Sequence, residues 1–493
     1  SAVQGFALAQ YRLALFYEEP SSGKPDLAKA ARWYGEAADK GVPQASYRLG
    51  MLYEKGRGVT KDEIVAFSLY RKAAENGYAE AQFRLSVMLQ EGRGGQKDLV
   101  QSADWLRKAV DQGLAMAQYH LGIMLLNGQD IAKDEARGAD LVLTAAKQGL
   151  PEALYAKALM LQEGRFLEKN EAKAAELITF TATMGLPAAQ NRVAEMYQEG
   201  RVFKKSESSA AEWYRKAAEQ GLSNAQYQLA LMLEEGRGID RNETTAAGWY
   251  RKSAEQGKAE SQYRLAVMYE EGRGVAKDDA AAVAWYKKAS DSNNIEAQYR
   301  LGVMLEEGRG VNKDEVAAVS LLKKASDKGS VDAGYRLGLL YQAGRGVQRD
   351  PVQAVNLFLS AAQSGHPLSA AMLGFMFEKG IGVDRDYAKA AQWYEKAARK
   401  GVADAQFNLG NLYARGDGVS KSFSEALIWY TKAAEQKNSL AAYNIGAIYE
   451  YGLGVKADRE KALEWFRRSA SLGNRAAEQM LTTLTPAITN EAK

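Results

Sequence analysis

Aromatic side chains recur at intervals of 36 residues or multiples of 36 and form the first candidate binding surface. If each lies at the same place on a repeated helix, the rings line one concave face, where they could hold a peptide or a partner helix. Partial burial of the rings between neighbouring helices is the alternative, and both can hold at different depths. The row comprises Tyr47, Phe83, Tyr119, Tyr155, Tyr227, Tyr263, Tyr299, Tyr335, Phe407 and Tyr443.

Eight arginines share a second repeated position, in a glycine-rich turn. Guanidinium groups along one edge could follow an anionic polymer such as an acidic polysaccharide. Acidic residues precede many of them, as at Glu270 and Glu271, so we favour ion pairing within or between copies. The turn lacks the Gly-Lys-Ser/Thr signature of a phosphate-binding loop. The row comprises Arg57, Arg93, Arg165, Arg201, Arg237, Arg273, Arg309 and Arg345.

A third candidate lies at about residues 113–220, where the turns lose a glycine at positions 130, 166 and 202. Clusters of exposed apolar residues are unusual on a free surface. We therefore expect a partner-binding turn patch with altered local curvature, and drift in a tolerant segment is the alternative. The patch comprises Phe166, Leu167, Val202 and Phe203.

No group of residues predicts catalysis or metal binding. The chain has no cysteine, and its two histidines, His120 and His366, are far apart in the sequence. Two distant histidines make neither a metal site nor a nucleophile–base pair. Carboxylates are plentiful but spread along the chain. We expect no enzymatic activity, no metal and no cofactor.

The element that positions these rows is a unit of 36 residues, well represented by residues 257–292. Leu265 and Met268 belong to an apolar stripe that predicts a first helix over about 258–271. Glycines then break the helix, and Asp278 is the expected N-cap of a second helix that carries Trp285. The eight tryptophans share one position in the repeat, and we expect one in mid-array, such as Trp249, to fill a core shared between copies.

The consensus of the copies is A-x-x-x-L-G-x-x-Y-x-x-G-x-G-V-x-x-D, followed by A-x-x-W-Y and A-A-x-x-G. One copy carries it in Ala405, Leu409, Gly410, Tyr413, Gly416, Gly418, Val419, Ala426, Trp429, Tyr430, Ala433 and Ala434. This pattern resembles the tetratricopeptide-related Sel-one-like repeat (SLR) family over about residues 1–485. The resemblance implies an all-α superhelix that acts as a scaffold for protein complexes and has no catalytic chemistry.

We therefore expect a right-handed superhelical solenoid of about thirteen helix-turn-helix repeats with a C-terminal capping helix. Residues 1–4 match the end of a preceding helix, from a truncated repeat or a leader junction. Residues 5–472 form the repeats, residues 473–486 the capping helix and residues 487–493 a flexible tail.

The composition of the chain limits the classes of partner that we expect. Charged residues make up 26% of the chain and the net charge is only +4, so nothing indicates nucleic-acid binding. No apolar run approaches the roughly 18 residues needed to span a bilayer. We expect a non-enzymatic scaffold that binds proteins in a bacterial envelope, host-interaction or signalling assembly. Binding of acidic polysaccharide is the alternative function. A periplasmic or cell-envelope location is favoured, with the cytoplasm as the alternative.

Overall fold

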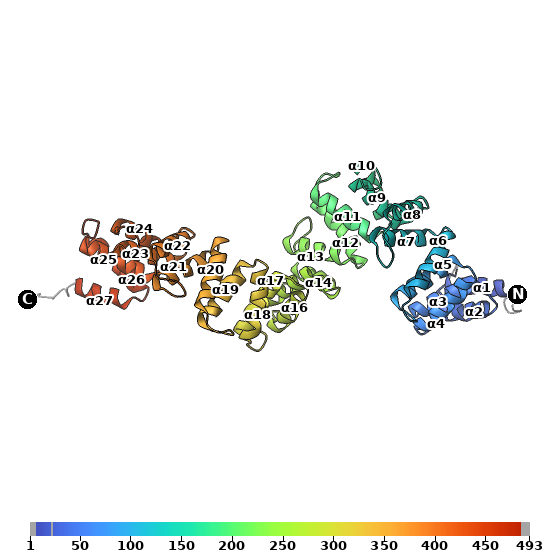
Figure 1. Ribbon diagram of the computed structural model, residues 1–493, viewed down its shortest axis with the longest axis horizontal. Coiled ribbons are helices and arrows are strands. Elements are labelled where there is room, and N and C mark those ends of the chain that lie inside the picture. The colour runs from blue at the N-terminus through green and yellow to red at the C-terminus, as the bar shows by residue number, and fades with distance from the viewer. Residues whose placement is uncertain (1–5, 21–22, 485–493) are drawn as a thin grey trace, which may run out of the picture. The chain divides into compact units, whose positions relative to one another are not determined.

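The computed structural model describes residues 6–20 and 23–484 of the 493-residue chain. Within those ranges every regular element is a helix, 27 in all, which confirms the all-α prediction. The chain divides into two compact units, residues 1–241 and 242–493. In both units, first helices of a repeat (A helices, odd-numbered) alternate with second helices (B helices, even-numbered), as Figure 1 shows.

Unit 1 contains seven A helices and six B helices. Its A helices are α1 (Ala7–Glu18), α3 (Pro43–Lys55), α5 (Ala79–Glu91), α7 (Ala115–Asn127), α9 (Pro151–Glu163), α11 (Pro187–Glu199) and α13 (Ser223–Glu235). Its B helices are α2 (Leu27–Asp39), α4 (Glu63–Glu75), α6 (Leu99–Asp111), α8 (Glu135–Lys147), α10 (Glu171–Thr183) and α12 (Glu207–Glu219).

Unit 2 begins with a B helix and ends with an A helix. Its B helices are α14 (Glu243–Glu255), α16 (Asp279–Asp291), α18 (Glu315–Asp327), α20 (Pro351–Gln363), α22 (Tyr387–Arg399), α24 (Phe423–Glu435) and α26 (Arg459–Ser471). Its A helices are α15 (Ala259–Glu271), α17 (Ile295–Glu307), α19 (Val331–Ala343), α21 (Pro367–Lys379), α23 (Ala403–Arg415), α25 (Ser439–Tyr451) and α27 (Arg475–Leu484). Helix α27 lies in the segment expected to cap the array, whereas the expectations for residues 1–4 and 487–493 fall outside the described residues.

Within each unit, every interior A helix packs against the B helix of its own repeat and the B helix of the repeat before it. Alanines such as Ala37, Ala38 and Ala45 are almost fully buried, and their small side chains let helices approach closely. The apolar faces of a single A–B helix pair are buried only when neighbouring repeats pack against them. The hydrophobic core is therefore shared along the stack, as in other repeat proteins.

The helix caps follow the sequence prediction. All thirteen B helices begin after an Asp, Asn or Ser whose side chain accepts a hydrogen bond from a backbone N–H, as Asp278 does from Ala281 at 2.9 Å. The residues that follow the B helices adopt the left-handed conformation even where glycine is replaced, with φ of 64° at Asn293 and 66° at Lys437.

The core differs from the expectation in one respect. Tyr70 and Tyr286 on the B helices are fully buried, whereas seven of the eight tryptophans are half-buried and only Trp429 is buried. Trp249 is half-buried, and the Lys252 ammonium lies 4.0 Å from the centre of its ring. Such a cation–π contact suits an indole that keeps one face near solvent.

Candidate protein-binding surfaces

The ten aromatic residues of the predicted row all lie on A helices, and all ten are half-buried. Five rings of the row rest on the aromatic ring of the B helix in the same repeat. The centroid distances are 5.6 Å for Tyr47–Tyr70, 5.9 Å for Tyr263–Tyr286, 5.9 Å for Tyr335–Phe358, 5.9 Å for Phe407–Tyr430 and 5.4 Å for Tyr443–Phe466. Each ring therefore stabilises its own helix pair and still exposes part of its surface.

Three other rings of the row rest on aliphatic side chains. Tyr119 packs against the cluster that contains Val142, Tyr155 against the cluster that contains Ile178, and Tyr299 against the cluster that contains Leu322. Burial raises the pKa of Tyr119 and of Tyr155, so these hydroxyls stay protonated near neutral pH. The row consequently offers neutral, amphipathic contact area.

A Tyr–Glu–Arg clamp joins neighbouring repeats. The Tyr286 hydroxyl on α16 donates to the Glu270 carboxylate on α15 at 2.7 Å. Arg309, in the turn after α17, donates to the same carboxylate at 2.8 Å and lies 4.0 Å from Asp279, the first residue of α16. Unit 1 repeats the arrangement: Tyr70 donates to Glu54 at 2.7 Å, and Arg93 pairs with Glu54 at 2.9 Å.

The clamp shifts the titration of its members. Burial alone would raise the pKa of Glu270, but the hydrogen bonds from Tyr286 and Arg309 outweigh it and hold the pKa below the ordinary value of 4.5. Burial and the hydrogen bond to Glu270 both raise the pKa of Tyr286. The carboxylate is therefore charged at neutral pH and bonded on both sides.

The turn arginines are consequently engaged in ion pairs. Seven of the eight pair with a carboxylate: Arg93 with Glu54 and Glu63, Arg165 with Glu135, Arg201 with Glu199, Arg237 with Glu207, Arg273 with Glu243, Arg309 with Glu270, and Arg345 with Glu315. Within the described residues no ion pair involves Arg57, which is exposed. These contacts favour the pairing interpretation over a row of arginines open to a polyanion.

A signal for the clamp was present in the sequence but was missed. When a B helix begins with an acidic residue, the next turn carries arginine in every case: Glu63 and Arg93, Glu135 and Arg165, Glu171 and Arg201, Glu207 and Arg237, Glu243 and Arg273, Asp279 and Arg309, Glu315 and Arg345. B helices that begin with Leu99, Pro351, Tyr387 or Phe423 are followed by Gln129, Ile381, Asp417 and Leu453. Leu27 followed by Arg57 is the exception, which explains the unpaired guanidinium.

In the divergent turns, residues other than glycine adopt the left-handed backbone conformation that glycine adopts in the other copies. Asp130, Phe166 and Val202 have φ of 61°, 64° and 67°, and a β-branched residue such as Val202 is strained there. At the equivalent Gly274, an added Cβ would lie 2.2 Å from the Glu243 carbonyl oxygen. The divergent turns must therefore stand further from the preceding B helix than the glycine turns do.

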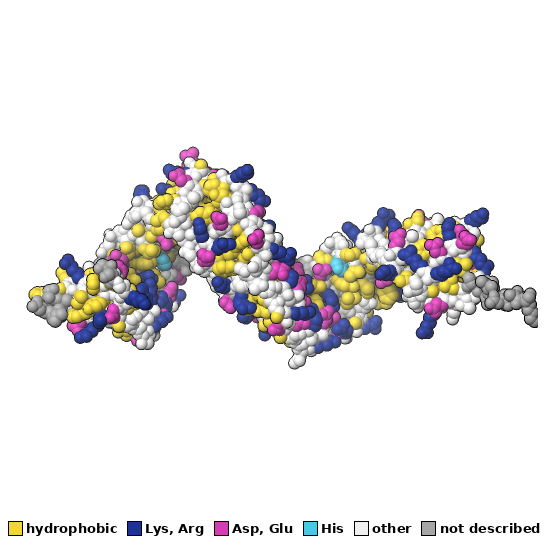
Figure 2. All heavy atoms as spheres, turned by 180° about the vertical axis from the view of Figure 1, so that it is seen from behind, with side chains coloured by type: hydrophobic (Ala, Val, Ile, Leu, Met, Phe, Trp, Pro, Cys, Tyr) yellow, Lys and Arg dark blue, Asp and Glu magenta, His cyan; other side chains and the backbone are white. Residues whose placement is uncertain are grey.

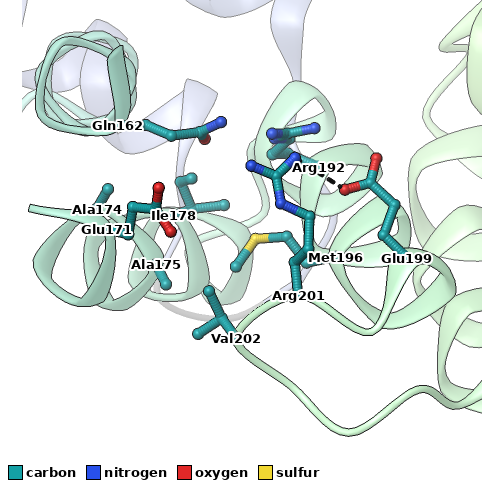
Figure 3. A pocket seen from close by; sticks show the side chains of 10 residues that line it. All are labelled: Gln162, Glu171, Ala174, Ala175, Ile178, Arg192, Met196, Glu199, Arg201 and Val202. Carbon is teal, nitrogen blue, oxygen red and sulfur yellow. Dashed lines mark hydrogen bonds and ion pairs between the residues drawn. The ribbon is translucent and has the colours of Figure 1, made fainter. Parts of the chain in front are cut away.

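A small cavity marks this separation. It has a volume of about 20 Å³, room for about one water molecule, and lies where α10, α11 and the following turn meet. Figure 3 shows Ile178 from α10, Met196 from α11 and Val202 from the turn around it. Ile178 stands where most B helices place an aromatic ring, so the gap has two causes: a smaller core residue and a turn that carries a Cβ.

The four patch residues divide into two pairs. Phe166 is 38% exposed with the Arg165 guanidinium 4.8 Å from its ring centre, and Val202 is 58% exposed. Phe203 stacks on Tyr197 at 4.6 Å, and Leu167 packs against the cluster that contains Val142. Leu167 and Phe203 thus contribute to packing, and Phe166 and Val202 form the surface of the patch.

Neither histidine belongs to a candidate metal or catalytic centre. His120 Nε2 lies 3.2 Å from the Gln90 side chain, and His366 caps α21 by accepting from the Ser369 backbone N–H at 3.1 Å. In the part of the chain that the structure describes, no three His, Cys, Asp or Glu residues gather closely enough to hold a metal ion.

On the face drawn in Figure 2, basic and acidic side chains are interspersed with hydrophobic areas. Among residues 6–20 and 23–484, no helix has the length and apolar character that crossing a bilayer requires.

The family model of the Sel1 repeat matches thirteen consecutive segments between residues 7 and 474. A solved protein described as a protective antigen present in uropathogenic Escherichia coli strains, with an SLR fold, is 34% identical. Its alignment covers 85% of this chain and 93% of that one, with a TM-score of 0.71. A Sel1 repeat protein from Oxalobacter formigenes is 31% identical over 63% of this chain and 90% of its own, with a TM-score of 0.52. No curated protein matches the chain.

Proposed function

Because the chain belongs to the Sel1 repeat family, a non-enzymatic repeat-scaffold fold, we propose that it binds protein partners through its tyrosine-lined face. The observation that supports this proposal is the half-burial of all ten aromatic residues in the row. Rings held from below by the B helix lose little conformational freedom on binding, and this favours their use as anchors for a peptide or a partner helix.

The setting that we propose is a bacterial envelope, host-interaction or signalling assembly. Its support is the 34% identity to a protein described as a protective antigen of uropathogenic E. coli. The exposed turn residues Phe166 and Val202 form a second, smaller contact in this proposal, since they keep apolar side chains at strained, solvent-facing positions.

Site-specific photo-cross-linking in the native cell tests the proposal. A photoreactive phenylalanine analogue at Tyr299 should cross-link a protein partner, because this ring lies on the proposed face and rests on an aliphatic side chain. The matched control is the same analogue at Lys323, which is exposed on the B helix α18. Cross-links from Lys323 with none from Tyr299 would contradict the proposed face.

A further inference from the structure

The inter-repeat clamp is absent between α23 and α25 in unit 2, where its glutamate, its acidic B-helix residue and its arginine are all replaced by apolar residues. Tyr430 on α24 keeps the clamp tyrosine, but Ala414 stands where Glu270 stands in its own repeat. Phe423 replaces the acidic residue that begins the B helix, and Leu453 replaces the turn arginine of the next repeat. Ala414, Phe423 and Leu453 therefore all lie at clamp positions, and none of them can form the ion pairs of the clamp.

A cavity of about 270 Å³ occupies this place, and Ala414, Phe423 and Leu453 all line it. It is slightly smaller than the roughly 300–1,000 Å³ of common small-molecule sites, so it suits one side chain or one terminal residue of a peptide. The cavity thus occurs where the large, charged clamp side chains have been replaced together.

Polar groups are retained on one wall of the cavity. The Tyr430 hydroxyl donates to Asn411 Oδ1 at 2.7 Å, and Asn444 Nδ2 donates to the same oxygen at 3.3 Å. Asn411 occupies an A-helix position that is aliphatic in most copies. An asparagine pair beside a tyrosine offers amide N–H donors to a carbonyl or carboxylate oxygen.

The charge at the rim also differs from other repeats. Arg415 lines the cavity, is exposed, and takes part in no ion pair within the described residues. Its position carries glutamate in seven other copies: Glu19, Glu91, Glu163, Glu199, Glu235, Glu271 and Glu307. The local charge is therefore complementary to an anionic group, and Arg is the side chain best suited to bind a carboxylate.

From these contacts we infer that the cavity binds a peptide residue that ends in a carboxylate, either a Glu side chain or a C-terminal residue. The carboxylate pairs with Arg415 and accepts from the asparagine amides, and its aliphatic stem lies against Phe423, Ile448 and Leu453. This inference deepens the proposed scaffold function by naming a chemical feature of the partner, but it concerns a site separate from the tyrosine row.

The test uses the full chain with methyl-labelled isoleucine, because Ile448 lines the cavity and reports on its occupancy by NMR. The probes are three N-acetylated peptides: Ala-Glu-Ala amide, Ala-Ala-Leu with a free C-terminus, and the neutral Ala-Gln-Ala amide. We expect one or both carboxylate peptides to shift the Ile448 methyl signal, and the peptide that does so identifies the source of the carboxylate. No shift from either, or an equal shift from the neutral peptide, would overturn the inference.

Two variants separate this site from adventitious binding. Arg415→Glu introduces the residue that most other copies carry at this position. It should weaken binding of the carboxylate peptide about tenfold or more, since it replaces electrostatic attraction by repulsion. Ala414→Glu combined with Leu453→Arg rebuilds part of the clamp and should abolish the shift while the chain stays folded. Unchanged binding in either variant would place the peptide elsewhere. If the model peptides do not bind, the proposal for the tyrosine row is not affected. If Tyr299 gives no cross-links, the proposal for this cavity is not affected.

Discussion

Single residues at turns decide how closely neighbouring repeats approach. A glycine at the second turn position accepts a left-handed conformation and leaves no Cβ to meet the preceding B helix. Val202 keeps the same conformation at φ 67° with a β-branched side chain. Relief of that strain should therefore stabilise the chain locally.

Val202→Gly is predicted to raise the local free energy of opening of α11 and α12 by about 1 kcal/mol. Native-state hydrogen exchange measures this quantity. The matched reverse change, Gly274→Val, should lower it in α15 and α16 by about 2 kcal/mol, because its Cβ meets the Glu243 backbone. Destabilisation by Val202→Gly would show that the valine is not strained. If the turn patch binds a partner, the glycine variant should also weaken that binding.

The clamp gives a prediction for pH. Because the pKa of Glu270 is lowered in the folded chain, the clamp stabilises fully above the ordinary carboxyl value of 4.5. That contribution is lost as the pH falls through the lowered folded value. Acidification from about pH 5 to about pH 3 should therefore reduce the opening free energy of α15–α17.

Glu270→Gln is the control for this pH prediction, because an amide does not titrate in that range. The variant should reduce the pH dependence of the opening free energy of α15–α17. The α23–α25 region, where Ala414 replaces the clamp glutamate, should lack the contribution of the clamp to this pH dependence. An identical acid response in Glu270→Gln would mean that other carboxylates are responsible.

At the scale of the element, the sequence was sufficient for the helices and their caps. A strict period and an Asp, Asn or Ser before each B helix specify where helices begin, because the cap depends on local backbone geometry alone. Which of the large apolar side chains on a B helix are buried was not predictable in the same way. Trp285 and Tyr286 are adjacent and both large, and only packing against the next A helix shows that the tyrosine is interior.

The surfaces were partly predictable for the same reason. The aromatic row follows from helical spacing, and its half-burial was one of the two alternatives. The clamp joins residues 30 to 39 positions apart, such as Glu54 and Arg93, so no local pattern indicates it. Likewise, the positive φ of Val202 follows from its place in the stack and not from its own preference.

Tyr286→Ala is predicted to cost about 3–5 kcal/mol, because it leaves a cavity in a fully buried site and removes a donor to Glu270. Trp285→Ala should cost clearly less, since that ring is half-buried. Local opening free energies in α15–α17 measure both. A larger loss for the tryptophan would contradict the assignment of the core.

At the scale of the whole molecule, stability is a sum over repeats and their nearest neighbours. Within unit 2, damage at Tyr286 should therefore be greatest in α15–α17 and should decline along the helices on either side. Uniform loss of exchange protection throughout the unit would contradict nearest-neighbour coupling.

We propose that the tyrosine-lined face binds the partner and that the turn arginines hold the repeats together. The most direct test is the Kd of a cross-linked partner for two triple variants at low and high salt. Tyr119→Ser, Tyr155→Ser and Tyr299→Ser together should weaken binding about tenfold or more, with little salt dependence. Arg57→Ser, Arg165→Ser and Arg201→Ser together should leave the Kd nearly unchanged. Loss of affinity in the arginine variant alone, with wild-type binding that falls steeply as salt rises, would contradict the account.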